Sequence, residues 1–457
     1  MKEGNIKIMI DTLFEVFEQK NGGIKLLPYN IAMSLIKSCK IIKCKNNEYY
    51  CPYGLIDERE IKRIITTAMA RKVDDIPNFT GSKNNAFSIF EDMSFRKDLS
   101  FPIYEIPVEN GTIKLKNNQV EFCDEYHITP YRLPTKYNPN APRPKRFMEW
   151  LNDLFYEDDI KGFQEFMGYC LIPTTIGQMM LVVMGNGEEG KSIIGIVLKN
   201  LLGDAWVDCD IRDIEENRFT SATLDKKLVG YQDDKDDNPL KSTNNIKKII
   251  TGKGRTMVEK KGIDKYEGEI TSRLIVCSNF PLSAVSDNSE GFYRRIYPIR
   301  VKPKPKDRIV DSHYDEPMMY ELEGILNWCI EGLLRLMKNN FKFSISPRSR
   351  ELQKDMREEG NTIDSFIKDR VIFEKDAQIS VRDLYITYEH YCQYNKIDKQ
   401  GTKQFGRYIK AHMDTLNIKK EHNREGDYYI GMKVIPYKNI LLEQANEEEE
   451  ENKNVNN

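Results

Sequence analysis

The residues from Gly185 to Ser192 have the types and spacing of a phosphate-binding loop. They read GNGEEGKS and fit the pattern G-x-x-x-x-G-K-S/T. The loop follows the apolar run MMLVVM and precedes SIIGIVLKNLLG, so it should connect a buried strand to a helix. Backbone N–H groups in such a loop and at the start of the helix can hold phosphate groups. We expect Lys191 to contact the β and γ phosphates and the Ser192 hydroxyl to bind Mg²⁺.

Two acidic side chains, Glu188 and Glu189, lie inside this loop, where a polyanion should bind. Side chains of such a loop can point outward while its N–H groups face the ligand, so the two glutamates do not exclude ATP. A glycine-rich turn without a ligand is the alternative. The residues expected to contact ATP are Gly185, Asn186, Gly187, Glu188, Glu189, Gly190, Lys191 and Ser192.

A pair of carboxylates follows further along the chain. The segment KKLVGYQDDKDD predicts a strand over Leu228–Tyr231, with Asp233 and Asp234 at its end. Carboxylates at a strand end beside a phosphate-binding loop can hold Mg²⁺ and orient a water molecule. We expect Asp236 and Asp237 to be solvated loop residues.

Two more polar groups complete the predicted site. Leu274–Cys277 predicts another strand with Asn279 at its tip, where the amide can contact the γ phosphate and the attacking water. Arg294 and Arg295 precede the apolar run IYPIRV. They are either partners in a surface salt bridge or an arginine finger, which stabilises charge on the nucleotide of a neighbouring subunit.

This order of loop, acidic strand, asparagine-tipped strand and arginine pair resembles that of superfamily 3 helicases, a branch of the AAA+ ATPases. The stretches NGTIKL, NPNAPRPKRFMEWL, FQEFMGYCL and SNFPLSAVSDNSEGFYRRI resemble the phage, plasmid and poxvirus-type primase-helicases, and among them the self-loading replication helicases of staphylococcal-type mobile genetic islands. The resemblance covers about residues 100–440. It implies an ATP- and Mg²⁺-dependent replicative DNA helicase that draws one strand through a homo-hexameric ring. A separate primase or polymerase would be its partner.

The chain departs from this family in two respects. The residue before Gly190 is usually Asn in the family and is Glu189 here, a departure that concerns the detailed geometry of the loop and not ATP binding. Members with primase activity carry a long N-terminal catalytic domain with histidine motifs, whereas the first histidine here is His127. Priming activity is therefore not expected.

The stretch TGKGRTMVEKKGIDKYEG predicts a hairpin rich in basic residues. In the family this insertion projects into the channel of the ring and grips single-stranded DNA. Lysines at a turn are compact charges suited to phosphate contacts that ignore base sequence. An ordinary solvated hairpin is the alternative. The candidate DNA-binding residues are Lys253, Arg255, Lys260, Lys261 and Lys265.

The elements around these residues predict an α/β fold, and the resemblance implies that its centre is an AAA+ P-loop ATPase core. We expect an N-terminal α+β domain before this core and a C-terminal winged helix after it. Alternating strands and helices indicate a parallel sheet in the core, and Asn110-Gly111 indicates a hairpin before it. In the winged helix, the helix Thr402–His412 and the wing around Arg424 would face duplex DNA. The expected segments are 1–100 (accessory domain), 101–177 (strands and helices before the motor), 178–345 (ATPase core), 360–440 (winged helix) and 441–457 (acidic disordered tail).

Composition excludes several classes of protein. No apolar run approaches the length of a membrane span, and the N-terminus lacks a signal-peptide cleavage site, so we expect a cytoplasmic protein without a membrane partner. The net charge of −2 includes the acidic run Glu447–Glu451, and without that run the chain is slightly basic, which leaves DNA binding open.

Cys39, Cys44 and Cys51 lack the paired spacing of a zinc ribbon and are expected to be free thiols.

Two functions of other classes share the loop. A nucleoside or nucleotide kinase would need a small acceptor pocket but neither the basic hairpin nor a trans-acting arginine. An ATP-switched, origin-binding initiator would bind ATP and DNA without unwinding the duplex. The acidic pair weighs against the initiator, because a switch that only binds ATP does not need a hydrolytic site.

Overall fold

The computed structural model describes residues 3–18, 28–70, 79–97, 99–217, 219–236, 240, 242–252, 256–259, 265–268, 270–282, 284, 290–304, 314–359, 362–395, 397, 399–414, 416–423 and 426–435. The chain divides into two units. The first comprises Met1–Asp237, Asn244–Pro281 and Arg295–Arg350. The second comprises Asn238–Thr243, Leu282–Arg294 and Glu351–Asn457.

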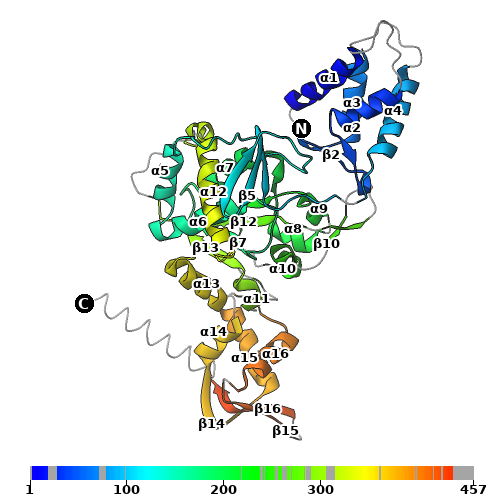
Figure 1. The fold of residues 1–457 in the computed structure, drawn as a ribbon. Coiled ribbons are helices and arrows are strands. Elements are labelled where there is room, and N and C mark those ends of the chain that lie inside the picture. The colour runs from blue at the N-terminus through cyan, green and yellow to red at the C-terminus, as the bar shows by residue number, and fades with distance from the viewer. Residues whose placement is uncertain are drawn as a thin grey trace. The chain divides into compact units, whose positions relative to one another are not determined.

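The first unit begins with a helical region that carries a small sheet (Figure 1). Its core is formed by apolar side chains of the four helices and of strands β2 and β3, and the sheet is the antiparallel β1-β2-β3. The elements are α1 (Glu3–Glu18), α2 (Pro28–Lys37), β1 (Ile42–Lys43), η1 (Lys45–Asn47), β2 (Tyr49–Cys51), β3 (Gly54–Ile56), α3 (Glu58–Ala70) and α4 (Phe79–Ser94).

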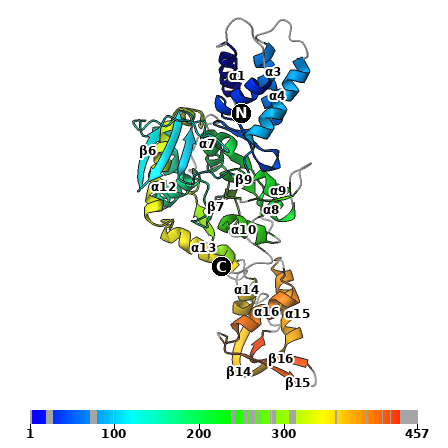
Figure 2. The ribbon, with the colours of Figure 1, turned by 45° about the vertical axis from the view of Figure 1, so that its right-hand side comes forward.

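A second antiparallel sheet follows, drawn in cyan in Figure 2. Its strands are β4 (Glu105–Val108), β5 (Gly111–Lys116) and β6 (Gln119–Cys123). The predicted hairpin at Asn110-Gly111 is confirmed, since Val108 pairs with Gly111. Arg132 joins this sheet to the preceding region, because its guanidinium donates hydrogen bonds of 2.6 Å to the carbonyls of Pro52, Val108 and Gly111.

The centre of the first unit is a five-stranded sheet in the order β13-β7-β12-β9-β8, with every neighbouring pair parallel. The predicted parallel α/β core is confirmed. Apolar runs such as MMLVVM form these strands because a parallel sheet is covered on both faces, and all five residues of β7 are buried. The strands are β7 (Met180–Met184), β8 (Trp206–Asp208), β9 (Val229–Lys235), β12 (Arg273–Ser278) and β13 (Ile296–Arg300).

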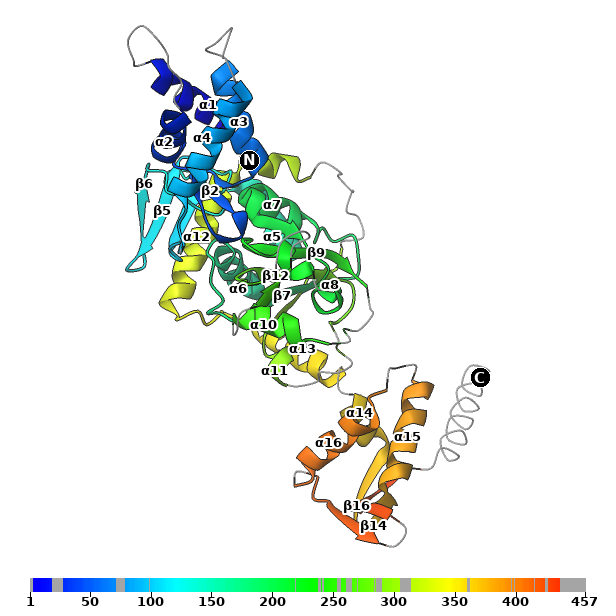
Figure 3. The ribbon, with the colours of Figure 1, turned by 90° about the vertical axis from the view of Figure 1, so that its right-hand side faces the viewer.

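Helices cover this sheet from both sides (Figure 3). The crossover from β7 to β8 runs along the sheet in the opposite direction to those from β8 to β9 and from β9 to β12. Right-handed crossovers therefore place α7 on one face and α8 and α10 on the other. The helices of this region are α5 (Lys145–Leu154), α6 (Glu157–Tyr169), α7 (Ile193–Leu202), η2 (Gly203–Ala205), α8 (Ile211–Glu216), α9 (Thr220–Thr223), α10 (Asn244–Thr251), η3 (Glu316–Tyr320) and α12 (Leu322–Lys338).

The second unit has its own apolar core and a three-stranded antiparallel sheet in the order β14-β16-β15. The helix expected over Thr402–His412 is present as α16, whereas the expected wing at Arg424 and the segment 441–457 lie outside the described residues. The elements are α11 (Glu290–Tyr293), α14 (Thr362–Arg370), β14 (Val371–Ser380), α15 (Val381–Tyr394), α16 (Thr402–His412), β15 (Lys419–Asn423) and β16 (Gly426–Val434). Helix α13 (Pro347–Glu359) crosses the boundary between the units.

Among the residues that the structure describes, no helix combines the length and the apolar character that crossing a membrane requires.

Candidate functional site

The loop from Gly185 to Ser192 follows the carboxyl end of β7 and leads into α7. Three of its residues have positive φ, which are Gly187 (107°), Glu188 (61°) and Gly190 (98°). Two of them are glycines because only glycine adopts such angles at no steric cost. Ser192 is the N-cap residue of α7, and it is exposed. The loop thus curves back on itself and ends at the N-terminus of a helix, which is the arrangement that binds anions.

The carboxylate of Glu189 lies inside the curve of this loop. It accepts hydrogen bonds from the backbone N–H of Asn186 and, at 3.0 Å, from that of Gly187. It also forms an ion pair of 2.8 Å with the ammonium of Lys191. Burial raises the pKa of the Glu189 carboxyl, but these donors outweigh burial, so its pKa lies below the usual value.

The expectation that loop side chains point outward is correct for Glu188 and wrong for Glu189. The side chain of Glu188 is 76% exposed and pairs with Lys304 at 2.6 Å. The side chain of Glu189 is only 3% exposed. Glu189 turns inward because the N–H groups of Asn186 and Gly187 and the buried ammonium of Lys191 need a hydrogen-bond acceptor. Its carboxylate serves all three donors at once.

The end of β12 lies between the loop and the acidic strand, because β12 is paired with β7 on one side and β9 on the other. Asn279, directly after β12, accepts a hydrogen bond of 3.0 Å from Lys191 through Oδ1. Its Nδ2 donates at 3.3 Å to Oδ1 of Asp234. The structure therefore brings together Lys191, Asn279 and Asp234 at the carboxyl edge of one sheet.

Asp233 and Asp234 lie within the last residues of strand β9 rather than after it. The strand covers Val229–Lys235, whereas the sequence predicted an end at Tyr231. Pairing with β12 shifts register here and Asp234 has a φ of 49°, so the strand is irregular at this point. Both carboxylates are exposed, and Asp233 accepts a hydrogen bond of 3.2 Å from the Tyr231 hydroxyl. Together with the exposed hydroxyl of Ser192 they supply the oxygen ligands that Mg²⁺ prefers.

Asp236 differs from its expected role as a solvated loop residue. Its carboxylate forms an ion pair of 2.8 Å with Arg212 and lies 3.4 Å from the ammonium of the buried Lys235. Asp236 therefore anchors the end of β9, and Asp237 lies outside the described residues.

Two residues at this site were not anticipated. A cavity of about 190 Å³ beside the loop is lined by Gly185, Glu189 and Asn279, and also by the exposed Arg300 at the end of β13. The other residue is Trp150 of α5, whose indole N–H donates to the carbonyl of Gly190 at 3.3 Å. Arg300 could have been found only from the register of the parallel sheet. In that register Arg300 of β13 is paired with Met184 of β7, the last residue before the loop.

Arg295 lies at the amino end of the β7–β13 ladder, and the loop follows the carboxyl end of β7. The N–H of Met180, at the start of β7, donates to the carbonyl of Arg295 at 2.9 Å. Gly185 follows the other end of the same strand, so the backbones of Arg295 and Gly185 are roughly 20 Å apart along the strand direction. Arg294 is exposed. Arg295 is therefore not placed to reach the loop of its own chain.

The predicted hairpin contains two antiparallel strands, β10 (Thr256–Val258) and β11 (Tyr266–Gly268). Lys265, just before β11, pairs with Glu259 at 2.9 Å, and its side chain is 54% exposed. The other candidate DNA-binding residues lie outside the described residues, namely Lys253, Arg255, Lys260 and Lys261.

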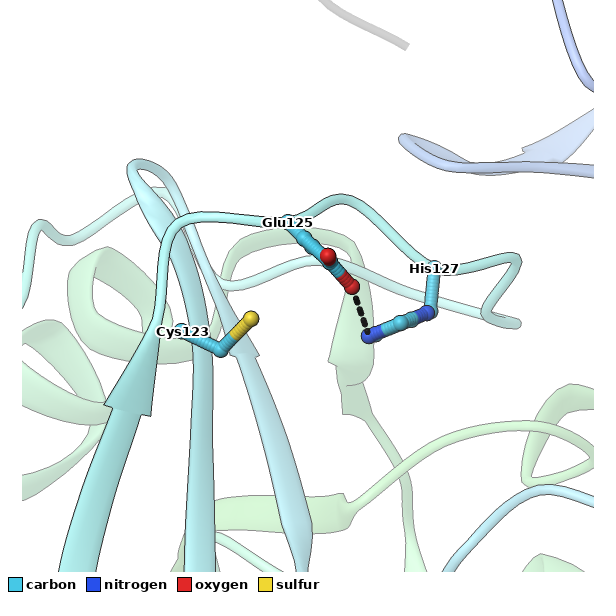
Figure 4. Close-up of side chains that lie close together, drawn as sticks. All are labelled: Cys123, Glu125 and His127. Carbon is cyan, nitrogen blue, oxygen red and sulfur yellow. Dashed lines mark ion pairs between the residues drawn. The ribbon is translucent and has the colours of Figure 1, made fainter.

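One further group of side chains could hold a metal ion. Cys123, Glu125 and His127 alternate along an extended segment, and their ligand atoms lie within 4.8 Å of one another (Figure 4). The His127 ring lies 3.7 Å from the Glu125 carboxylate. All three are at least partly exposed and belong to the end of β6 and the segment after it, not to the edge that carries Lys191 and Asp234.

One family model matches the segment that carries the loop. Residues 183–295 match DUF5906, a family of unknown function. This match spans the loop, the acidic pair, Asn279 and the two arginines. No curated protein matches the chain.

Three solved structures of the C-terminal region of NrS-1 are similar to the chain. Two A-form apo structures have 12% identity and a TM-score of 0.49, and they cover 89% of this chain and 100% and 99% of their own. A further apo structure has 13% identity, the same TM-score of 0.49 and coverages of 89% and 99%.

Proposed function

We propose that the chain is an ATP-dependent DNA helicase with a superfamily 3 type of AAA+ P-loop core. The observation that carries the proposal is the contiguous series Lys191–Asn279–Asp234 at one sheet edge, with bonds of 3.0 and 3.3 Å. Three separate strand ends converge there on the loop. Hydrolysis of a phosphoanhydride needs a cation, a metal-binding carboxylate and a polar group for water at one place.

In the proposed site each residue has a separate task. The loop N–H groups and Lys191 bind the β and γ phosphates, and the start of α7 lies against the same anion. Mg²⁺ would be held by Ser192, Asp233 and Asp234, because each offers an exposed oxygen atom as a metal ligand on the loop side of the sheet. Mg²⁺, when bound, would neutralise charge on the phosphate oxygens. Asn279 positions the attacking water, since its amide lies between the lysine and a carboxylate.

The position of the arginine pair supports an oligomeric ring. Arg295 lies at the far end of the β7–β13 ladder from its own loop, so its side chain would act on another subunit. An arginine supplied in trans stabilises charge that develops during phosphoryl transfer. A closed ring of identical chains places such an arginine at every nucleotide, and we propose a homo-hexamer.

DNA would be bound by two separate elements. The sequence between β10 and β11 contains the predicted Lys260 and Lys261, and the exposed Lys265 directly precedes β11. In the second unit the elements from α14 to β16 follow the order helix, strand, two helices and two strands. This order supports a winged helix in which α16 would contact duplex DNA. A separate primase or polymerase would use the single strand that the ring releases.

The test is ATP hydrolysis with and without single-stranded DNA, paired with displacement of the shorter strand of a forked duplex. A helicase shows DNA-stimulated hydrolysis and strand displacement together. An initiator binds ATP and DNA without stimulated turnover, and a kinase transfers phosphate to a nucleoside or nucleotide. Either result would replace the proposed function.

A further inference from the structure

We infer that the carboxylate of Glu189 occupies the place of a nucleotide phosphate in the loop and must leave before ATP can bind. Glu189 would thus be a specificity-determining residue, because only a polyphosphate that binds the loop strongly enough to displace its carboxylate would occupy the site. The inference rests on the proposed function in one respect, which is that the loop is the nucleotide site.

The donors that hold Glu189 are those that a phosphate needs. Two consecutive N–H groups, of Asn186 and Gly187, point at its oxygens, and the ammonium of Lys191 lies 2.8 Å away. A phosphate-binding loop offers this combination of backbone N–H groups and one lysine to its ligand. A carboxylate on the same donors satisfies them in the same way, as an oxygen anion.

The space inside the loop is filled by this side chain. The carboxylate packs against Gly185, where an added Cβ would lie 2.7 Å from Oε2 and 2.8 Å from Oε1 of Glu189. The Glu189 side chain is 3% exposed, and that of Lys191 is 9% exposed. A phosphate cannot reach the same N–H groups while the carboxylate is there. The two anions therefore exclude each other by both volume and charge.

The neighbouring glutamate shows that the inward position is not imposed by the loop as a whole. Glu188 has the same side chain and lies one residue away, yet it points to solvent and pairs with Lys304. Lys191 is also held without Glu189, because it donates to Asn279 at 3.0 Å. Displacing Glu189 therefore leaves the lysine positioned for a phosphate, and the loop keeps its other contacts.

The decisive comparison uses ATP binding by titration calorimetry with the full chain and Mg²⁺. Glu189→Gln keeps the shape of the side chain but removes the charge that competes with phosphate. Glu188→Gln removes the same charge from the exposed neighbour, so the difference between the two variants measures the contact and not the net charge. We expect Glu189→Gln to bind ATP about tenfold more tightly than Glu188→Gln, because a hydrogen-bonded ion pair no longer has to be broken.

Thermal unfolding gives a second readout, which a merely misfolded variant would not reproduce. Without nucleotide, Glu189→Gln should unfold at a lower temperature than the wild type, because the ion pair with Lys191 is lost. The increase in that temperature on adding saturating ATP should be larger in Glu189→Gln than in the wild type, since tighter ligands stabilise more.

The outcomes separate the inference from the proposed function. Suppose that the wild type binds ATP, that Lys191→Ala does not, and that Glu189→Gln binds ATP no more tightly than Glu188→Gln. This result would overturn the inference and leave the nucleotide site in place. Absence of ATP binding in the wild type and in both glutamine variants would overturn the proposed function and the inference with it.

Discussion

The ammonium of Lys191 lies 3.0 Å from Oδ1 of Asn279, although the two residues belong to different strand ends. Lys191 lies in the loop after β7, and Asn279 follows β12. The other end of the same amide faces Asp234 at 3.3 Å, which fixes its orientation. The loop and the acidic strand are therefore connected through one side chain. A change at this amide should affect catalysis more than it affects binding.

Replacing Asn279 by Ala should lower kcat by about 100-fold or more, because loss of one preorganised polar group at a reacting centre has effects of this size. ATP affinity should change little, since the loop N–H groups remain. Steady-state ATPase kinetics separate the two quantities. Asn200→Ala is the matched control, because the exposed Asn200 amide donates to the carbonyl of Ile196 in its own helix. An unchanged kcat in Asn279→Ala would remove Asn279 from the site.

Asp234→Asn should retain nucleotide binding and lose Mg²⁺-dependent turnover, since the variant removes one charge from the proposed metal ligands but leaves the loop intact. Asp233→Asn should behave in the same way. A titration of ATPase activity with Mg²⁺ checks this. The control is Asp236→Asn, which removes a carboxylate from the ion pair with Arg212 and should keep the Mg²⁺ dependence of the wild type. Normal Mg²⁺ dependence in both Asp variants would mean that the metal site is elsewhere.

Mixing two inactive variants tests whether arginines act in trans. One variant carries Arg294→Ala and Arg295→Ala, and the other carries Lys191→Ala. If each site needs a neighbour's arginine, a ring that contains both chains has some complete sites, and random exchange at equal amounts restores about one quarter of wild-type ATPase. Arginines that serve their own chain would leave the mixture as inactive as its components.

Lys260→Ala together with Lys261→Ala should leave basal ATPase intact and abolish its stimulation by single-stranded DNA. The expected reason is that lysines at the turn contact phosphates and are not part of the nucleotide site. Binding of single-stranded DNA at several salt concentrations checks this, because the slope of log K against log salt should become less steep by about 0.7 per lost phosphate contact. Wild-type unwinding by the double variant would make the hairpin an ordinary surface feature.

The parallel sheet could be predicted from the sequence because its strands are short apolar runs separated by helical patterns. Strand order could not, and that order is what places Asn279 between the loop and Asp234. Arg300 was missed for the same reason, since a residue at the end of one strand gives no sign of which loop lies beside it. The inward position of Glu189 also depends on three-dimensional surroundings, since Glu188 and Glu189 are chemically identical but have different ion-pair partners.

We propose that the Gly185–Ser192 loop hydrolyses ATP in response to DNA. The most direct measurement compares ATP hydrolysis by the wild type, Lys191→Ala and Lys199→Ala, each with and without single-stranded DNA. Lys199 is the matched control, because it lies on the exposed side of α7 near the ring of Trp206. We expect DNA-stimulated hydrolysis in the wild type and in Lys199→Ala, and a loss of about 100-fold or more in Lys191→Ala. Equal hydrolysis by Lys191→Ala and the wild type, or none by any of the three proteins, would contradict the account.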